Sequence, residues 1–335
     1  MPARLNVALV GAGLMGSFHA ETLAHRLPGA RLAVIADADE AKARELIARL
    51  GLDNTRYERD SQAAIDDPGV QAVAIATPAR FHAELIVAAA KAGKPAFTEK
   101  PLSHTVEEAD RAIEAIARAG TFLQVGFQRR FDRGFARARK AVEDGTLGKV
   151  HLLRSITRDP AVPRPEGPLP WATFLETMIH DFDVLRWLAA SEPVEVSAMA
   201  ASIAWGEAVS TGFVDTAVCT VRFANGALGT ADVSFNGAFG YDVRAEVFGT
   251  GGMMAIGDGR DDNATLYAAA GVSRPHSAWF EPMFGEAYTA ELAHFVECAR
   301  SGAAPAVSGA DGRASLRMAL AAIESAKLGR AVSVA

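Results

Sequence analysis

The first part of the chain alternates short apolar runs with segments whose apolar positions recur at helical spacing. The apolar runs predict strands at 5–10, 31–36, 70–76, 95–98 and 122–125. The periodic segments predict helices at 17–26, 40–50, 81–92 and 106–118. Strands that alternate with helices are typical of a doubly wound parallel sheet, so we expect one such α/β domain over residues 1–125.

The pattern changes after residue 125, where strand-like segments follow one another with short turns between them. The predicted strands are 151–157, 194–204, 216–223, 226–235, 241–248 and 252–256. The predicted helices are 131–144, 174–190, 286–301 and 310–329. Because turns such as Asn225-Gly226 are typical of hairpins, we expect a second α/β domain, residues 126–335, with a mostly antiparallel sheet. A proline-rich loop at 160–170 is expected to lie over the site or at an interface.

A glycine-rich turn follows the first predicted strand. Its sequence is Gly11-Ala12-Gly13-Leu14-Met15-Gly16. In the dinucleotide fingerprint the first Gly permits a tight turn, the second lets the backbone approach a pyrophosphate, and the third lets helix and strand pack closely. Free amides at the start of the next helix then bind the phosphates. Strand, glycines and helix in this order predict a Rossmann nucleotide-binding domain.

The ends of the next strands carry further candidate cofactor residues. Asp37 ends the second predicted strand, where a carboxylate can bind both ribose hydroxyls of NAD and would repel the 2′-phosphate of NADP. We therefore expect NAD, with NADP less favoured. Thr77-Pro78 ends another strand and is expected to touch the cofactor, although an ordinary strand-ending turn explains it equally well. His82, on the following helix, can be a cap or a packing residue.

Thr98-Glu99-Lys100-Pro101 closes the strand predicted at 95–98. The carboxyl ends of strands are where ligands bind in an open α/β sheet. Lys100 can therefore point its ammonium group at a bound substrate. A salt bridge between Lys100 and Glu99 is the alternative interpretation.

Candidate acid–base residues lie on the helix predicted at 174–190. Glu176 and His180 are four positions apart, so their side chains share a face, and the carboxylate can orient the imidazole. Histidine is the side chain best suited to exchange a proton near neutral pH. Asp183 can also reach His180, and a surface ion-pair cluster remains an alternative. We expect no metal, because no second His or Cys lies at ligand spacing.

Composition narrows the choice of partners and compartment. The 335 residues carry a formal net charge of -6, so no basic surface favours nucleic acid or an anionic membrane as a partner. The longest apolar runs are shorter than the ~20 residues of a membrane helix, and no signal-peptide pattern is present. The two cysteines have neither metal-site nor redox-motif spacing. We expect a soluble cytoplasmic protein.

Five motifs in combination resemble one known family. They are Gly11–Gly16, Ala76-Thr77-Pro78 with His82, Thr98–Pro101, residues 124–132 and Ile179-His180-Asp181-Phe182-Asp183. Together they resemble the Gfo/Idh/MocA oxidoreductases and, within that family, the inositol 2-dehydrogenases. The resemblance implies a Rossmann domain and a carboxyl-terminal α/β domain with a large open sheet. It also implies a homo-oligomer, dimer or tetramer, in which this sheet packs between subunits.

The resemblance further implies roles for individual residues. Lys100 would bind the reacting oxygen and His180 would accept its proton, with Glu176 as the partner of the imidazole. The residues that would line the substrate pocket are Lys100, Arg129, Asp159, His180 and Tyr241. The residues that would bind the cofactor are Gly11, Gly13, Leu14, Met15, Gly16, Asp37, Thr77, Pro78, His82, Glu99 and Lys100.

Some positions depart from the family pattern. Glu176 stands where the family usually has Asp, which lengthens the arm by one methylene group. Asp159 stands where Asn is common in the inositol enzymes, which adds a negative charge to the pocket. Gln128 replaces a frequent Met, and residues 171–173 replace a glycine-rich approach to the helix. The extra carboxylate can favour more hydroxyl hydrogen bonds or a cationic substrate such as an amino-cyclitol.

We therefore expect an NAD-dependent oxidoreductase that transfers hydride between a secondary alcohol of a cyclic polyol or pyranose and nicotinamide. The same residues serve a keto-sugar, inosose or amino-cyclitol reductase, because they do not set the direction. An NAD(H)-binding sensor or scaffold without chemistry is the alternative of another class. The presence of both Lys100 and His180 disfavours it.

Overall fold

The chain forms two compact units. The structure, a computed structural model, describes residues 4–160, 170–257 and 264–334, and the loop predicted at 160–170 lies outside them except for its two ends. One unit holds the chain up to Phe127 together with Tyr288–Arg313, and the other holds Gln128–Ala287 and Ala314–Ala335. Among the described residues, no helix is both long enough and apolar enough to cross a membrane.

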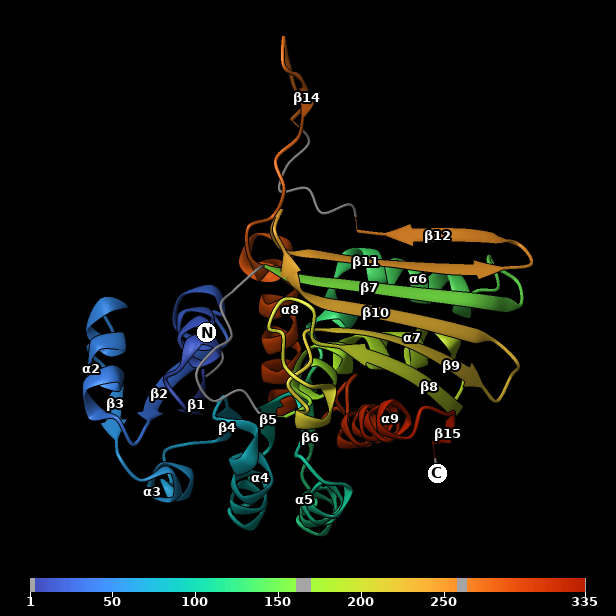
Figure 1. Cartoon of the computed structure of the whole chain (residues 1–335). Coiled ribbons are helices and arrows are strands. Elements are labelled where there is room, and N and C mark those ends of the chain that lie inside the picture. Colours follow the sequence, from blue (N-terminus) through green and yellow to red (C-terminus); the bar gives the residue numbers. More distant parts are fainter. Residues whose placement is uncertain (1–3, 161–169, 258–263, 335) are drawn as a thin grey trace. The chain divides into compact units, whose positions relative to one another are not determined.

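The first unit contains the predicted doubly wound sheet, six parallel strands in the order β3-β2-β1-β4-β5-β6 (Figure 1). The strands are β1 (Leu5–Val10), β2 (Ala30–Ala36), β3 (Arg56–Glu58), β4 (Ala72–Ile75), β5 (Ala96–Glu99) and β6 (Leu123–Gly126). The α-helices are α1 (Leu14–Glu21), α2 (Glu40–Arg49), α3 (Ser61–Asp66), α4 (His82–Lys91) and α5 (Val106–Arg118). Because β1 pairs with both β2 and β4, the crevice at their carboxyl ends is a topological switch point, where ligands bind.

Two elements of this unit were not predicted, β3 and α3. Each is short, and α3 buries only Ala64 and Ile65, so neither produces a clear apolar period. By contrast β4 is buried at every position, as expected for a parallel strand covered on both faces.

A segment from late in the chain completes the core of the first unit. Helix α8 runs over Phe280–Ser301, six residues earlier at its start than predicted. Its residues Leu292, Phe295 and Val296 pack into the same buried cluster as β1 and β2. This apolar packing explains why Tyr288–Arg313 belongs to a unit from which it is distant in sequence.

The second unit contains a seven-stranded sheet in the order β12-β11-β7-β10-β9-β8-β15. Only β7 and β10 pair in parallel among these described strands, so the predicted mostly antiparallel sheet is confirmed. The strands are β7 (Val150–Pro160), β8 (Pro193–Ala201), β9 (Thr216–Phe223), β10 (Leu228–Gly237), β11 (Asp242–Gly249), β12 (Gly252–Ile256) and β15 (Val332–Ser333). A separate hairpin joins β13 (Leu266–Ala268) to β14 (Gly271–Ser273).

Helices cover one face of this sheet. They include α6 (Arg133–Glu143), α7 (Ile179–Ala189) and part of α9 (Gly309–Leu328), with α7 packed against β7 and β10 (Figure 1). The helix predicted at 174–190 is not α-helical throughout, because Thr173–Met178 forms a π-helical turn. That turn changes the spacing between Glu176 and His180 from the α-helical one on which their shared face was predicted.

The other face of the seven-stranded sheet carries exposed apolar side chains. Met253, Phe248, Leu152 and Leu228 lie in register on four strands, from β12 across β11 and β7 to β10. Each of these four side chains is at least 40% exposed. We call these four residues the open-face row.

Candidate active site

A cleft of about 470 Å³ lies at the carboxyl ends of the central strands of the first unit. Residues that line it include Gly11, Gly13, Asp37, Thr77, Pro78 and Phe81. The sequence folds this way because apolar strands end at a tight glycine turn on β1 and at Thr77-Pro78 on β4. The cleft therefore brings together predicted cofactor residues that are up to 67 positions apart, from Gly11 to Pro78.

The glycines of the fingerprint meet three different needs. Gly11 has a positive φ of 101°, and an added Cβ would lie 2.5 Å from the carbonyl oxygen of Ala76. An added Cβ at Gly16 would lie 2.0 Å from the carbonyl oxygen of Gly11, so helix and strand pack too closely for a side chain. Gly13 differs, because its added Cβ would meet nothing within 4 Å. In the dinucleotide fingerprint, the second glycine is the position at which a pyrophosphate approaches the backbone, and the open space at Gly13 fits that approach.

The cleft has further features that fit a dinucleotide. Helix α1 begins after Gly13 with no side-chain cap, which leaves its first amides available to a phosphate. Thr77 Oγ1 is buried and has no hydrogen-bond partner among the described residues. A bound cofactor would supply one.

Asp37 is held firmly at the end of β2. Its Oδ2 accepts a hydrogen bond from the amide of Ala12 at 2.7 Å, and its Oδ1 accepts one from the amide of Asp39 at 2.9 Å. The carboxylate thus links the glycine turn to the start of the next loop while it lines the cleft. A fixed negative charge at this place suits a ribose diol and disfavours a phosphate.

His82, His19 and Glu99 are buried polar residues of the first unit. His82 is 1% exposed and lies between two backbone carbonyls, 2.7 Å from Pro101 O and 2.8 Å from Thr77 O. Glu99 is buried, and its Oε1 lies 2.7 Å from His19 Nε2. Burial favours the neutral acid, but the hydrogen bond and charge of His19 outweigh it and hold the pKa of Glu99 below its ordinary value.

Lys100 follows β5 directly, at the strand end where the sequence predicted it. It is half-buried and precedes Pro101 through a cis peptide bond. The ion-pair partner that the structure gives Glu99 is His19. The negative charge of Glu99 nevertheless interacts electrostatically with Lys100.

In the second unit, His180 lies in the first turn of α7 and is buried, whereas Glu176 is half-buried in the π-helical turn that precedes it. Two aspartates that follow His180 on α7 are each held by an arginine. Asp183 pairs with both Nε and Nη2 of Arg130, at 2.8 and 2.6 Å. Asp183, which the sequence allowed as a partner of His180, is thus bound in a two-point ion pair.

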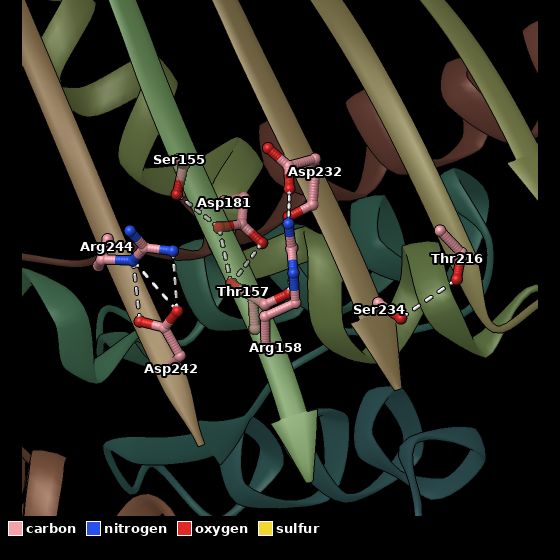
Figure 2. A network of polar contacts seen from close by, with 9 residues as sticks. All are labelled: Ser155, Thr157, Arg158, Asp181, Thr216, Asp232, Ser234, Asp242 and Arg244. Carbon is pink, nitrogen blue, oxygen red and sulfur yellow. Dashed lines mark hydrogen bonds and ion pairs between the residues drawn. The ribbon is translucent and has the colours of Figure 1, made fainter. Parts of the chain in front are cut away.

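Asp181 lies at the centre of a buried polar network that the sequence did not predict. Its carboxylate accepts hydrogen bonds from Ser155, from Thr157 at 3.0 Å and from Arg129 Nη1 at 2.7 Å. Figure 2 shows Ser155 and Thr157 reaching it from β7. Every partner is at most 1% exposed, so the network ties α7 firmly to β7 beside His180.

The polar residues predicted to line a substrate pocket lie close to this network. Arg129 is 1% exposed, and its Nη2 donates to Thr157 at 2.9 Å. Burial, opposed by the charge of Arg129, raises the pKa of the Tyr241 phenol above its ordinary value, and Asp159 and Asp181 add to the rise. Asp159 accepts a hydrogen bond from Thr177 Oγ1 at 3.1 Å. Tyr241 is therefore a neutral donor beside a buried guanidinium.

The part of the chain that the structure describes holds no cluster of three or more His, Cys, Asp or Glu side chains arranged to bind a metal ion. The site residues fall into two sets, one in each unit. The first unit holds Lys100 and the residues that fit a dinucleotide. The second unit holds His180, Glu176, Arg129, Asp159 and Tyr241.

A dinucleotide cleft at the switch point of a Rossmann sheet defines a class of nucleotide-dependent enzymes, and comparisons with known proteins agree. Residues 5–127 match the model of an oxidoreductase family with an NAD-binding Rossmann fold, and residues 135–255 match the GFO/IDH/MocA C-terminal domain. The chain belongs to this family. The predicted family, enzyme class and cofactor are thereby confirmed, and the protein is an NAD-dependent oxidoreductase.

Individual relatives resemble the chain over its whole length. It is 35% identical over 335 residues to scyllo-inositol 2-dehydrogenase (NAD(+)) of Bacillus subtilis, covering 100% of this chain and 97% of that protein. It is 38% identical to myo-inositol 2-dehydrogenase of Thermotoga maritima, covering 98% of each. The crystal structure of scyllo-inositol dehydrogenase from Lactobacillus casei with bound NAD(H) and scyllo-inositol has a TM-score of 0.91 and 28% identity, with 99% of each chain covered.

Proposed function

We propose that this protein oxidises a ring hydroxyl of an inositol, or of a closely related cyclic polyol, with NAD. The observation that carries the proposal is the position of Lys100, a cation at the carboxyl end of β5 on the NAD-binding sheet. The full-length similarity to a scyllo-inositol and a myo-inositol 2-dehydrogenase supports the substrate class.

In the proposed mechanism the chain handles the substrate oxygen and its proton. NAD, when bound by the cleft residues, supplies the acceptor for the hydride that leaves the carbinol carbon. His180 takes the hydroxyl proton as the C=O bond forms, with Glu176 as its partner. Lys100 donates a hydrogen bond to the same oxygen and stabilises the negative charge that develops on it. The alcohol thus loses one hydride to NAD and one proton to His180, and it becomes a ketone.

Tyr241 and Asp159 are the proposed contacts for the remaining hydroxyl groups. Tyr241 is a neutral donor, and Asp159 is an acceptor oriented by Thr177. The guanidinium of Arg129 is buried and hydrogen-bonded to Asp181 and Thr157. Its proposed role is therefore to hold the pocket residues in position. The pairing of a donor with an acceptor suits a polyol, whose hydroxyl groups both donate and accept.

Steady-state rates test the proposed function. We expect NAD reduction with at least one inositol stereoisomer in a panel of inositols, pyranoses and amino-cyclitols. Faster rates with NADH and an inosose or keto-sugar would favour the reductive alternative. NADH binding without turnover of any alcohol or ketone in the panel would contradict the proposal. It would instead support the alternative function of an NAD(H)-binding sensor or scaffold.

Asp37 is expected to set the preference for NAD. Replacement by Ser, D37S, removes the charge that faces the ribose and should lower the ratio of kcat/KM for NAD over NADP by about 10- to 100-fold. Kinetics with both cofactors at saturating substrate measure this ratio. D39S, which alters the neighbouring carboxylate outside the cleft lining, is the matched control. An unchanged ratio in D37S would contradict the assignment.

We further propose that the open-face row is buried in an interface with a second copy of the chain. Four large apolar side chains in register on one sheet face form a continuous surface of the kind that marks an interface. L228E places a charge in the row and is expected to shift the protein to a smaller species in light scattering. L328E, at an exposed Leu on α9, should leave the mass unchanged. An equal mass for L228E and wild type would contradict this proposal.

A further inference from the structure

His82 has an unusual pair of neighbours for a buried histidine. Both ring nitrogens lie at hydrogen-bond distance from backbone carbonyl oxygens, Nδ1 at 2.7 Å from Pro101 O and Nε2 at 2.8 Å from Thr77 O. A carbonyl oxygen can only accept a hydrogen bond, so both nitrogens have to donate. A neutral imidazole has one N–H group, and its other nitrogen would direct a lone pair at the oxygen.

We infer that His82 is an imidazolium that clamps the end of β4 to the segment after β5. Only the protonated ring carries two N–H donors, and the ring is 1% exposed, so water does not replace either bond. A buried cation needs opposite charge nearby. Glu99 supplies it, since its carboxylate is buried in the same unit and interacts with His82, Lys100 and His19.

One effect opposes the charge. His82 is the first residue of α4, where the positive end of the helix dipole disfavours a cation. His82 lies in that first turn, so the dipole acts on it, but the two carbonyl contacts and the charge of Glu99 act directly on the ring and outweigh it. The contacts therefore determine the protonation state.

The clamp joins two parts of the site that the mechanism uses. Thr77 follows β4 and lines the cofactor cleft, whereas Pro101 follows Lys100 after the neighbouring strand β5. His82 thus fixes the wall of the cofactor cleft relative to the ammonium group that is proposed to bind the substrate oxygen. It acts through Thr77 and Lys100 as a positioning residue, and this role rests on the proposed function of Lys100.

The protonation state can be measured without any assay of activity. Solid-state NMR of the full-length protein with ¹⁵N-labelled histidine, near neutral pH, reports whether each ring nitrogen carries a proton. We expect both nitrogens of His82, assigned through contacts to Thr77 and Pro101, to be protonated. One bare nitrogen would overturn the inference. Because this readout needs no substrate, its failure is distinct from a failure of the proposed function.

Kinetics test the positioning role. H82Q provides an amide that can reach only one of the two carbonyls, so Lys100 should be displaced and kcat should fall by ~10²-fold. NADH affinity and substrate KM should change far less. H25Q is the matched control, because His25 is exposed and its Nε2 also lies 3.0 Å from a backbone carbonyl, that of Leu50. Wild-type kcat in H82Q, or equal losses of kcat and NADH affinity, would contradict the role.

Discussion

Replacing His180 with Ala is expected to lower kcat by about 10²- to 10⁴-fold, the usual contribution of a positioned general base. Without the imidazole, the hydroxyl proton has no acceptor on the chain as hydride leaves. Lys100→Met should cause a loss of ~10²- to 10³-fold, because it removes the hydrogen bond to the developing oxyanion. Steady-state kinetics with NAD and the preferred polyol measure both losses.

The same variants should still bind the cofactor, since the cleft is built from other residues of the first unit. NADH fluorescence titration checks this, with H25A at an exposed histidine as the control for the substitution. Turnover at the wild-type rate in either His180→Ala or Lys100→Met would contradict the assigned roles.

Breaking the buried pair of Arg129 and Asp181 is expected to produce the largest loss of stability. Both side chains are at most 1% exposed, so R129M leaves a carboxylate buried without its cation. The expected cost is about 3–5 kcal/mol in the free energy of unfolding. The double variant R129M/D181N removes both charges and should lose less than the two single variants added together.

Urea unfolding of the three variants measures these differences. R118M is the matched control, because Arg118 and Glu114 form an exposed ion pair at 2.6 Å, and such pairs contribute about 0.3–0.5 kcal/mol. If R129M were no less stable than R118M, the network around Asp181 would not be what ties α7 to β7.

The sequence predicted the parts of the fold that depend on local pattern. Apolar runs of four to seven residues separated by periodic helices correspond to the parallel sheet, and α5 was predicted with the observed bounds, Val106–Arg118. The fingerprint glycines and Asp37 were recognisable because each strand ends at the residue that shapes the cleft. What escaped prediction was short or distant in sequence. Three-residue β3 carries too few positions for a period.

Long-range polar contacts were the other part that the sequence did not reveal. Arg129 reaches Asp181 across 52 positions and Arg130 reaches Asp183 across 53. One signal was present, since two aspartates on a helix rich in buried apolar residues require cationic partners. The two contacts of His82 could not be predicted either, because its partners are backbone carbonyl oxygens, which carry no sequence signature.

The protein is proposed to remove a hydride from a ring carbon of a cyclic polyol. Turnover of inositol deuterated at the reacting carbon tests this proposal most directly, with the NADH product analysed by mass spectrometry and NMR. We expect deuterium on the C4 carbon of nicotinamide and conversion of the polyol to a ketone. NADH without deuterium, or NAD left unreduced with every inositol stereoisomer, would contradict the proposal.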